Sequence, residues 1–338
     1  MRMLPVLLGA FLVSWLGAAL AAEPASYRAG AQRFTAEMAR KHGLQETDIA
    51  VLMEKARYRQ DIIDAMRRPW EAKPWHQYRA TFVTDQRIAG GVRFWRENVQ
   101  TLARASAAYG VPPDIITAII GVETNYGGNL GRHRVIDALT TLGFSYPERA
   151  DFFRKELEHF LLLSREETID ATGVTGSYAG AVGMPQFIPS SYRAYAVDFD
   201  GDGRRDLWES RADVVGSVAS YFQRHGWKTG EPVVTRAELR NGIPPGVPVA
   251  EKKPVKPESR VGDLAAKGVL AVDPLDRSAR ATLIRLDGRQ DEYWLGLDNF
   301  YVITRYNHSN LYAMAVYQLS QEIKASYETE AGKTAAAN

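Results

Sequence analysis

The residues from Pro112 to Gly127, PPDIITAIIGVETNYG, constrain the fold of this chain more than any other stretch. The two prolines suit the start of a helix, where a missing N–H group costs nothing, and Gly127 suits its end. Isoleucines recur every three or four residues, so one face of the predicted helix is apolar, and Glu123 continues that face. A carboxyl group there pairs with an arginine, turns out to water, or keeps its proton because desolvation raises its pKa. In the last case it can donate that proton to a leaving group.

The first 22 residues predict a signal peptide and not a part of the fold. Arg2 gives a positive start, residues 4–16 are apolar but too short to span a bilayer, and Ala19-Leu20-Ala21 is a cleavage signal. An uncleaved anchor is the alternative interpretation. The sequence contains no cysteine, so neither a disulfide nor a lipid on an N-terminal cysteine is expected. We therefore predict a periplasmic protein, exported by a cleaved signal peptide, with no membrane anchor.

Helical periodicity dominates the rest of the chain and predicts a mainly α fold with a small β-rich subdomain. Residues 85–109 are expected to form one long helix, and residues 293–306 an aromatic, extended segment. The expected division, in chain order, is a signal peptide at 1–22, a helical α domain at 23–110 that partly packs on the core, a catalytic core at 111–230, a β-rich subdomain at 231–297, a return to the core at 298–327 and a disordered tail at 328–338.

Residues 173–189, GVTGSYAGAVGMPQFIP, interrupt the helical pattern with a glycine at every third or fourth position. This density disfavours a helix and indicates a tight loop or small hairpin, where the backbone approaches another group closely. A flexible linker is the alternative, but linkers seldom contain residues such as Met184, Phe187 and Ile188. We expect an ordered loop that lines a cleft.

Residues 198–209, DFDGDGRRDLWE, fit the pattern of an EF-hand calcium loop. Acidic residues at alternate positions direct oxygens to one centre, and Gly203 permits the sharp turn. The predicted ligands of a structural Ca²⁺ are Asp198, Asp200, Asp202, the backbone carbonyl of Arg204, Asp206 and Glu209. An acidic turn without a metal is the alternative. No organic cofactor is expected.

The remaining chemistry favours a polysaccharide substrate. A net charge of +2 does not indicate a nucleic acid, and the six histidines lack zinc-ligand spacing. The 16 Tyr, 7 Trp and 12 Phe can stack on sugar rings. Glycosidic cleavage usually needs two carboxylates, yet Asp137 is expected to cap a helix or lie at the surface, and Asp170 lies in a polar connector. A mechanism with one acid, in which the 2-acetamido group of the substrate acts as nucleophile, therefore remains open.

Three long motifs resemble one known family: VETNYGGNLG, GSYAGAVGMPQFIPSSYRAYAVDFDGDGRRDLW and NFYVITRYNHSNLYAMAVYQL. They are similar to the B-type lytic murein transglycosylases of glycoside hydrolase family 103, and the similarity runs from about residue 28 to 325. The resemblance implies a lysozyme-like helical core flanked by an α domain and a small β domain. It also implies cleavage of the β-1,4 bond between N-acetylmuramic acid and N-acetylglucosamine in peptidoglycan, which leaves a 1,6-anhydromuramoyl end.

The resemblance also implies roles for single residues. Glu123 matches the sole catalytic acid/base, and the loop 198–209 matches the calcium site of the family. The positions that match substrate-contacting residues are Ser177, Gln186, Tyr78, Arg149, Tyr221, Tyr306, Asn307 and Tyr312. Glu148 stands where the family has a second arginine, and Phe152 stands where it has a tyrosine.

Two rival functions follow from the same residues. One is a lysozyme-like muramidase that uses water as the acceptor, and the other is a non-catalytic, calcium-stapled protein that binds peptidoglycan. In each case the expected partner is the peptidoglycan glycan strand and not a nucleic acid. Association with other cell-wall enzymes is left open.

Overall fold

The computed structural model describes residues 23–68, 73–288 and 290–337. The predicted signal peptide lies outside the described residues. The fold is mainly helical with a small sheet, as the sequence predicts. Among the described residues no single helix is long and apolar enough to cross a membrane; α6 and α7, which meet at 112°, satisfy the length and composition criteria only as a pair.

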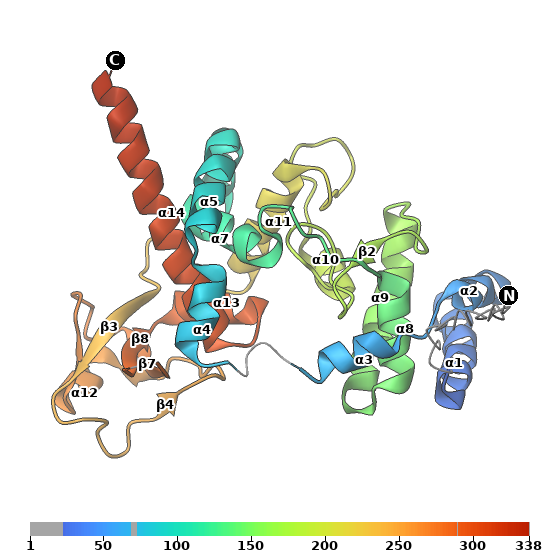
Figure 1. Cartoon of the computed structure of the whole chain (residues 1–338), viewed down its shortest axis with the longest axis horizontal. Coiled ribbons are helices and arrows are strands. Elements are labelled where there is room, and N and C mark those ends of the chain that lie inside the picture. Colours follow the sequence, from blue (N-terminus) through green and yellow to red (C-terminus); the bar gives the residue numbers. More distant parts are fainter. Residues whose placement is uncertain (1–22, 69–72, 289, 338) are drawn as a thin grey trace, which may run out of the picture.

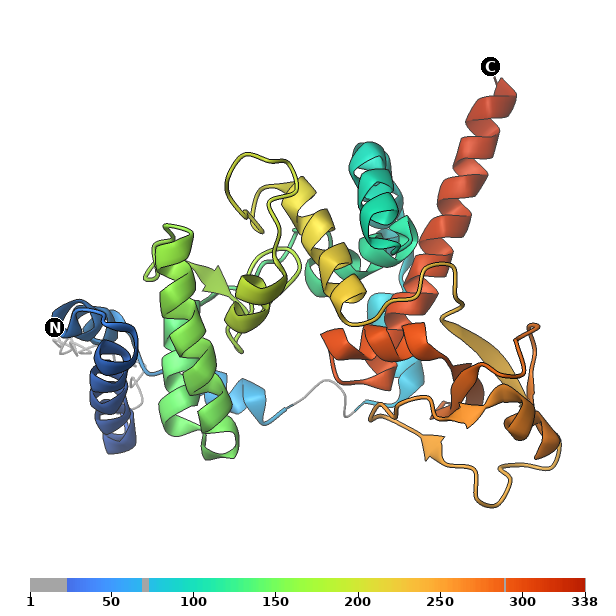
Figure 2. The same cartoon turned by 180° about the vertical axis from the view of Figure 1, so that it is seen from behind.

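The helices pack in two groups that do not follow chain order (Figures 1 and 2). The first group comprises α1 (Ala25–His42), α2 (Glu46–Lys55), α3 (Gln60–Met66), α8 (Val135–Ser145) and α9 (Ala150–Glu166), which the short 3₁₀ helix η2 (Pro147–Arg149) precedes. The second comprises α4 (Trp75–Phe82), α5 (Asp85–Glu97), α6 (Val99–Tyr109), α7 (Pro113–Thr124), α11 (Arg211–Arg224), α13 (Asp298–Tyr306) and α14 (Asn310–Ala337). Helix α10 (Pro189–Tyr195) contacts both α9 and α11 and so joins the groups.

The sheet subdomain contains six strands with its own small apolar core. The strands are β3 (Val234–Leu239), β4 (Val249–Ala250), β5 (Ser259–Arg260), β6 (Val269–Ala271), β7 (Arg280–Leu286) and β8 (Glu292–Gly296), with helix α12 (Val261–Ala266) between β5 and β6. The order is β4-β7-β8-β3-β6, in which only β4 and β7 run parallel, and β5 pairs with β7. A separate two-stranded pair joins β1 (His133–Arg134) to β2 (Thr175–Gly176).

The helix expected over residues 85–109 is in fact two helices. Asn98 interrupts it with φ of −124° and ψ of 23°. The Asn98 amide side chain donates to the carbonyl oxygen of Phe94 at 2.7 Å, so asparagine competes with the helical backbone for hydrogen bonds. The expectation of one continuous helix was therefore wrong.

Two further expectations need correction. Residues 293–306 are not extended throughout, because β8 is followed by the helix α13. The β-branched and aromatic residues of α13 have low helix propensity, so the sequence did not indicate a helix there. The tail is not disordered in the part described, since α14 continues to Ala337. Tyr327 stacks on Trp95 with ring centroids 4.5 Å apart, Glu330 pairs with Arg96, and the alanines at 335–337 favour helix.

Candidate active site

Helix α7 presents Glu123 from the centre of the second helix group. All its residues from Asp114 to Thr124 are buried except Glu123, which is partly exposed, and α5, α6, α11 and α14 pack around it. A helix that is apolar on all sides belongs in a core, as the isoleucine pattern indicates. Glu123 is therefore held rigidly with one edge of its side chain accessible.

The partner of Glu123 is a phenol and not an arginine. The Tyr312 hydroxyl donates a hydrogen bond to Glu123 Oε1 at 2.5 Å. Among the described residues Glu123 forms no ion pair, so the arginine-paired alternative does not hold. Burial raises the pKa of Glu123 to about 7, and the bond from Tyr312 partly opposes that rise. The carboxyl is thus poised to hold or release a proton near neutral pH.

The chain leaves α7 through two strained residues. Asn125 and Tyr126 have positive φ of 51° and 61°, a conformation that aromatic residues rarely adopt. The Tyr126 hydroxyl donates to the Arg87 carbonyl oxygen at 2.8 Å, and its ring covers Gly121 so closely that a Cβ there would lie 2.5 Å from the hydroxyl. Sequence reasoning missed this anchor; the paired glycines at 90–91, which also contact Tyr126, were its only signal. The contacts hold the end of α7, and therefore Glu123, in place.

Aromatic rings surround the carboxyl group. Tyr306 lies parallel to Tyr312 with centroids 6.4 Å apart, and Tyr221 lies 4.8 Å from Tyr306. Burial and the nearby Glu123 carboxyl raise the pKa of both Tyr306 and Tyr312, so both phenols remain protonated. Tyr78 is buried on α4 and is near enough to Tyr312 to raise its pKa further. The structure thus gathers the four predicted tyrosines into one cluster, which meets Glu123 through Tyr312.

The glycine-rich loop is ordered and docks directly beside Glu123. The Thr124 hydroxyl donates to the Met184 carbonyl oxygen at 2.9 Å, and the Tyr306 hydroxyl donates to that of Pro185 at 2.6 Å. Close backbone approach requires the glycines: a Cβ on Gly176 would lie 2.1 Å from the Ala181 oxygen. Gln186, at a positive φ of 50°, donates to the Leu130 carbonyl oxygen at 3.3 Å and ties the loop to the segment after α7.

Two other predicted contact residues, Ser177 and Arg149, contact groups other than Glu123. The Ser177 hydroxyl accepts bonds from the backbone N–H groups of Ala179 and Ala181, at 3.3 and 3.0 Å, and so closes the hairpin of the loop. Arg149 is exposed at the start of α9, its guanidinium 4.4 Å from the centroid of the Phe152 ring. Asn307 directly follows α13. Among the described residues neither Ser177 nor Arg149 bonds to Glu123, so any shared role needs a substrate between them.

No second carboxylate accompanies Glu123 within the described residues. Asp137 is buried, and not at the surface as one expectation held; it accepts a bond from the Arg57 backbone N–H at 2.9 Å and pairs with Arg134. Asp170 is exposed and accepts bonds from Thr172. Both acids therefore organise local structure, and the site contains one acid.

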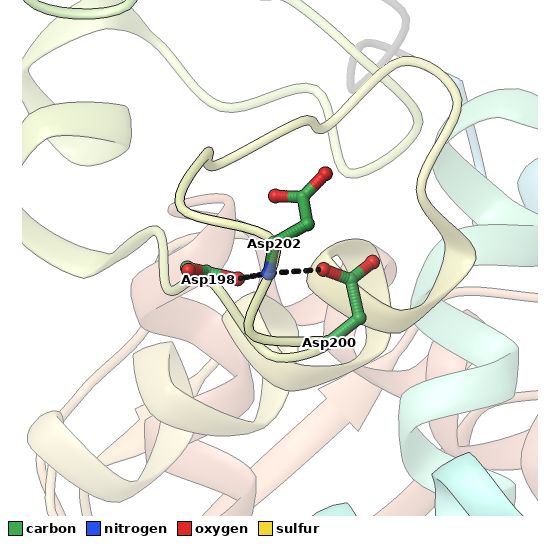
Figure 3. A group of neighbouring side chains, drawn as sticks. All are labelled: Asp198, Asp200 and Asp202. Carbon is green, nitrogen blue, oxygen red and sulfur yellow. Dashed lines mark hydrogen bonds between the residues drawn. The ribbon is translucent and has the colours of Figure 1, made fainter.

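The acidic loop gathers three of its predicted ligands. Oxygens of Asp198, Asp200 and Asp202 all lie within 4.8 Å of one another, and Figure 3 shows the Asp202 backbone nitrogen bonded to both other carboxylates. Asp206 instead accepts bonds from the N–H groups of Trp208 and Glu209, at 2.8 and 3.0 Å. Three converging, exposed carboxylates fit a hard cation such as Ca²⁺.

Sequence reasoning missed the residue that supports this loop. Asp213, fully buried on α11, accepts backbone bonds from Phe199 at 2.6 Å and from Asp206 at 2.7 Å. Its side chain therefore spans both ends of the loop. The helix pattern places Asp213 on α11, but nothing in sequence shows that it folds back on residues 199–206.

A mainly helical fold that holds one carboxyl with a pKa raised to about 7 among tyrosines fits a class of enzyme that cleaves glycosidic bonds by acid catalysis. Comparison with known proteins makes the assignment specific. The chain belongs to the family described as Transglycosylase SLT domain, which matches residues 26–321. This membership confirms the resemblance that the motifs around Glu123 and the acidic loop indicate.

Relatives within the family agree in sequence and in structure. Membrane-bound lytic murein transglycosylase B of Escherichia coli is 44% identical over 304 residues, which cover 87% of this chain and 82% of the relative. The structure of catenated lytic transglycosylase SltB1 from Pseudomonas aeruginosa is 51% identical, with a TM-score of 0.83, and the match covers 88% of this chain and 97% of that one.

Two further solved structures contain ligands. Lytic transglycosylase Slt35 of Escherichia coli, in complex with calcium, is 44% identical with a TM-score of 0.80, covering 88% of this chain and 93% of that one. SltB3 from Pseudomonas aeruginosa, in complex with NAG-anhNAM-pentapeptide, is 29% identical with a TM-score of 0.78, covering 89% and 80%.

Proposed function

We propose that this protein is a lytic transglycosylase that cleaves the β-1,4 bond between N-acetylmuramic acid and N-acetylglucosamine in peptidoglycan. Family membership and the murein transglycosylase relative support the activity. The observation that carries the mechanism is the lone Glu123 carboxyl, with its pKa raised to about 7 and one phenol as partner. A lone acid that is protonated near neutral pH suits a reaction in which one group both gives and takes a proton.

The chemistry proceeds in two proton transfers. Protonated Glu123 donates to the glycosidic oxygen as the bond to C1 breaks, and the 2-acetamido oxygen of the muramoyl residue bonds to C1. The Glu123 carboxylate then accepts the proton of the muramoyl 6-hydroxyl as that oxygen attacks C1 and displaces the acetamido oxygen. Tyr312 stabilises the carboxylate formed between the two steps, because its hydroxyl donates to Oε1. Water is not consumed, so the product carries a 1,6-anhydro ring.

Substitution of the acid tests the proposal. Glu123→Gln keeps the shape and can still accept from Tyr312 but cannot donate a carboxyl proton. We expect turnover of purified sacculi to fall by at least about 1,000-fold, while binding to insoluble peptidoglycan stays within about twofold. Glu37→Gln, an exposed acid on α1, serves as the control and should leave turnover unchanged. Full activity of Glu123→Gln would disprove the assignment of Glu123.

We also propose that the acidic loop holds a structural Ca²⁺ through Asp198, Asp200, Asp202, the Arg204 carbonyl, Asp206 and Glu209. The convergence of the first three carboxylates supports this, as does the calcium complex of Slt35. Bound there, the ion would neutralise three neighbouring negative charges and fix the connection between α10 and α11. It has no part in the proton transfers.

Export to the periplasm completes the proposal. It rests on the pattern of residues 1–22 and on the location of the peptidoglycan substrate. Sequencing the N-terminus of the protein purified from periplasmic extract tests it. We expect the mature chain to begin at Ala22 or Glu23, and a protein that retains Met1 would contradict cleavage.

A further inference from the structure

The segment 251–258, EKKPVKPE, contains three lysines, and the chemistry above does not use it. We call it the basic segment. Its lysines are Lys252, Lys253 and Lys256, of which the last two are exposed and form no ion pair among the described residues. Of its acids, Glu251 is paired with Arg285 at 2.8 Å, and Glu258 lies at the far end. The centre of the segment therefore carries positive charge that the protein does not neutralise.

The basic segment docks against the helix that supplies Tyr312. The Asn310 backbone N–H donates to the Lys252 carbonyl oxygen at 2.9 Å, and its side-chain amide donates to the carbonyl oxygens of Glu251 and Lys253 at 2.6 and 3.0 Å. Asn310 is buried and lies two residues before Tyr312, which contacts Glu123. The lysine backbone thus lies within about one helical turn of the partner of the catalytic acid.

The segment is also held rigidly on its other side. The Thr282 hydroxyl donates to the Val255 carbonyl oxygen at 3.3 Å, and Pro257 is buried. Two prolines, at 254 and 257, further restrict the backbone. A solvated lysine loop with no function needs no such anchoring, whereas a binding surface gains from it because less ordering remains to be done on binding.

Two arginines lie near His308, which is two residues before Asn310. Arg305 Nη1 lies 3.4 Å from His308 Nδ1. Burial lowers the pKa of His308, and the charges of Arg305 and of Arg149, from the other helix group, lower it further. Arg305 and Arg149 therefore add positive charge around His308, close in sequence to Asn310, where the basic segment docks.

We propose that the basic segment binds carboxylates of the peptide stem that the muramoyl residue carries, and so favours strands with intact stems. This inference rests on the proposed function. Asn310 ties the segment to the start of α14, two residues before Tyr312, so the segment lies beside the end of the helix that supplies the partner of Glu123. Ion pairs at an exposed surface are individually weak, so we expect the two lysines together to change affinity by about three- to tenfold.

The test compares two substrates with one double variant. Lys253→Gln/Lys256→Gln and the wild-type protein digest glycan strands with stems, and strands from which an amidase has removed the stems. We expect KM for stem-bearing strands to rise about three- to tenfold with kcat unchanged, and KM for stripped strands to stay within about 1.5-fold. Lys267→Gln, an exposed lysine of the same subdomain, is the matched control. The difference in KM between the double variant and the wild type on stem-bearing strands should vanish near 1 M salt, where the Debye length is about 3 Å.

The two arms separate the sources of carboxylate. Stripping the stem leaves the lactyl carboxylate of muramic acid free, so an equal rise in KM on both substrates would overturn the inference in favour of that group. No change on stem-bearing strands would also overturn it. Failure of the wild-type protein to cleave either substrate would instead count against the proposed function itself.

Discussion

At the scale of single residues, the Glu123–Tyr312 pair controls when the acid is active. Donation requires protonated Glu123, so kcat/KM should fall as pH rises through about 7, the pKa to which burial raises this carboxyl. Tyr312→Phe removes a hydrogen bond that favours the carboxylate, and the pKa of Glu123 should therefore rise further. We expect the alkaline limb of the pH–rate profile to move to higher pH and kcat to fall about tenfold. An unchanged limb would show that Tyr312 does not tune the acid.

The same carboxyl affects stability. Its folded pKa lies above the unfolded value, so the folded state binds the proton more tightly and loses stability as pH rises from about 4.5 to about 7. Glu123→Gln removes this loss. We expect the variant to be more stable than the wild type by about 1 to 3 kcal/mol at pH 8 but not at pH 4, measured by urea denaturation at both pH values. If the variant and the wild type were equally stable at pH 8 as well as at pH 4, the pKa of Glu123 would not be raised in the folded protein.

At the scale of elements, the end of α7 depends on the fit between Tyr126 and Gly121. An added Cβ at Gly121 would meet the Tyr126 hydroxyl at 2.5 Å, so the Tyr126 ring would have to shift and its bond to the Arg87 carbonyl would be disturbed. Gly121→Ala should lower the free energy of unfolding by about 1 to 3 kcal/mol, and it should lower activity because it displaces Glu123. Gly332→Ala, in exposed helix with no atom near the new Cβ, is the control and should be neutral or slightly stabilising in thermal unfolding. If both substitutions changed stability equally, the contact between Tyr126 and Gly121 would not hold the end of α7.

The acidic loop is an element whose stability should depend on calcium. Because only the folded chain brings the three carboxylates together, Ca²⁺ at about 100 times its Kd should stabilise the protein by about 2.7 kcal/mol. Asp202→Asn should reduce this gain strongly, while Asp263→Asn, an exposed acid on α12 of the sheet subdomain, should not. Differential scanning calorimetry with calcium and with chelator measures it. A Tm that changes neither with calcium nor with chelator would mean that the loop binds no calcium.

Local signals predicted most elements near the site and missed those that depend on distant contacts. The isoleucine pattern predicted α7. Ser210, of a residue type that favours helix starts, caps α11, and its hydroxyl accepts from Asp213 N–H at 3.2 Å. The break between α5 and α6 at Asn98 was not predicted, because it is caused by a side-chain hydrogen bond within an otherwise strong periodic pattern. The continued helix at Tyr327 escaped because it depends on Trp95, which is remote in sequence.

At the scale of the whole molecule, the site is assembled from segments that sequence spacing cannot relate. Glu123 and Tyr312 are 189 residues apart, and only the packing of α7 against α14 brings them together. Periodicity identified Glu123 as unusual and left its partner open between arginine, water and a retained proton. The predicted list of contact residues came from resemblance, and the structure gathers its tyrosines while leaving Ser177 and Arg149 apart from the acid.

The central claim is that one acid serves both proton transfers and that the substrate supplies the acceptor. The most direct test is the mass of the muramoyl ends released when the wild-type protein digests purified sacculi. An intramolecular attack by the 6-hydroxyl predicts anhydro ends throughout, each lighter by one water than a reducing end. Reducing muramic ends throughout would show that water is the acceptor, and would make the protein a muramidase.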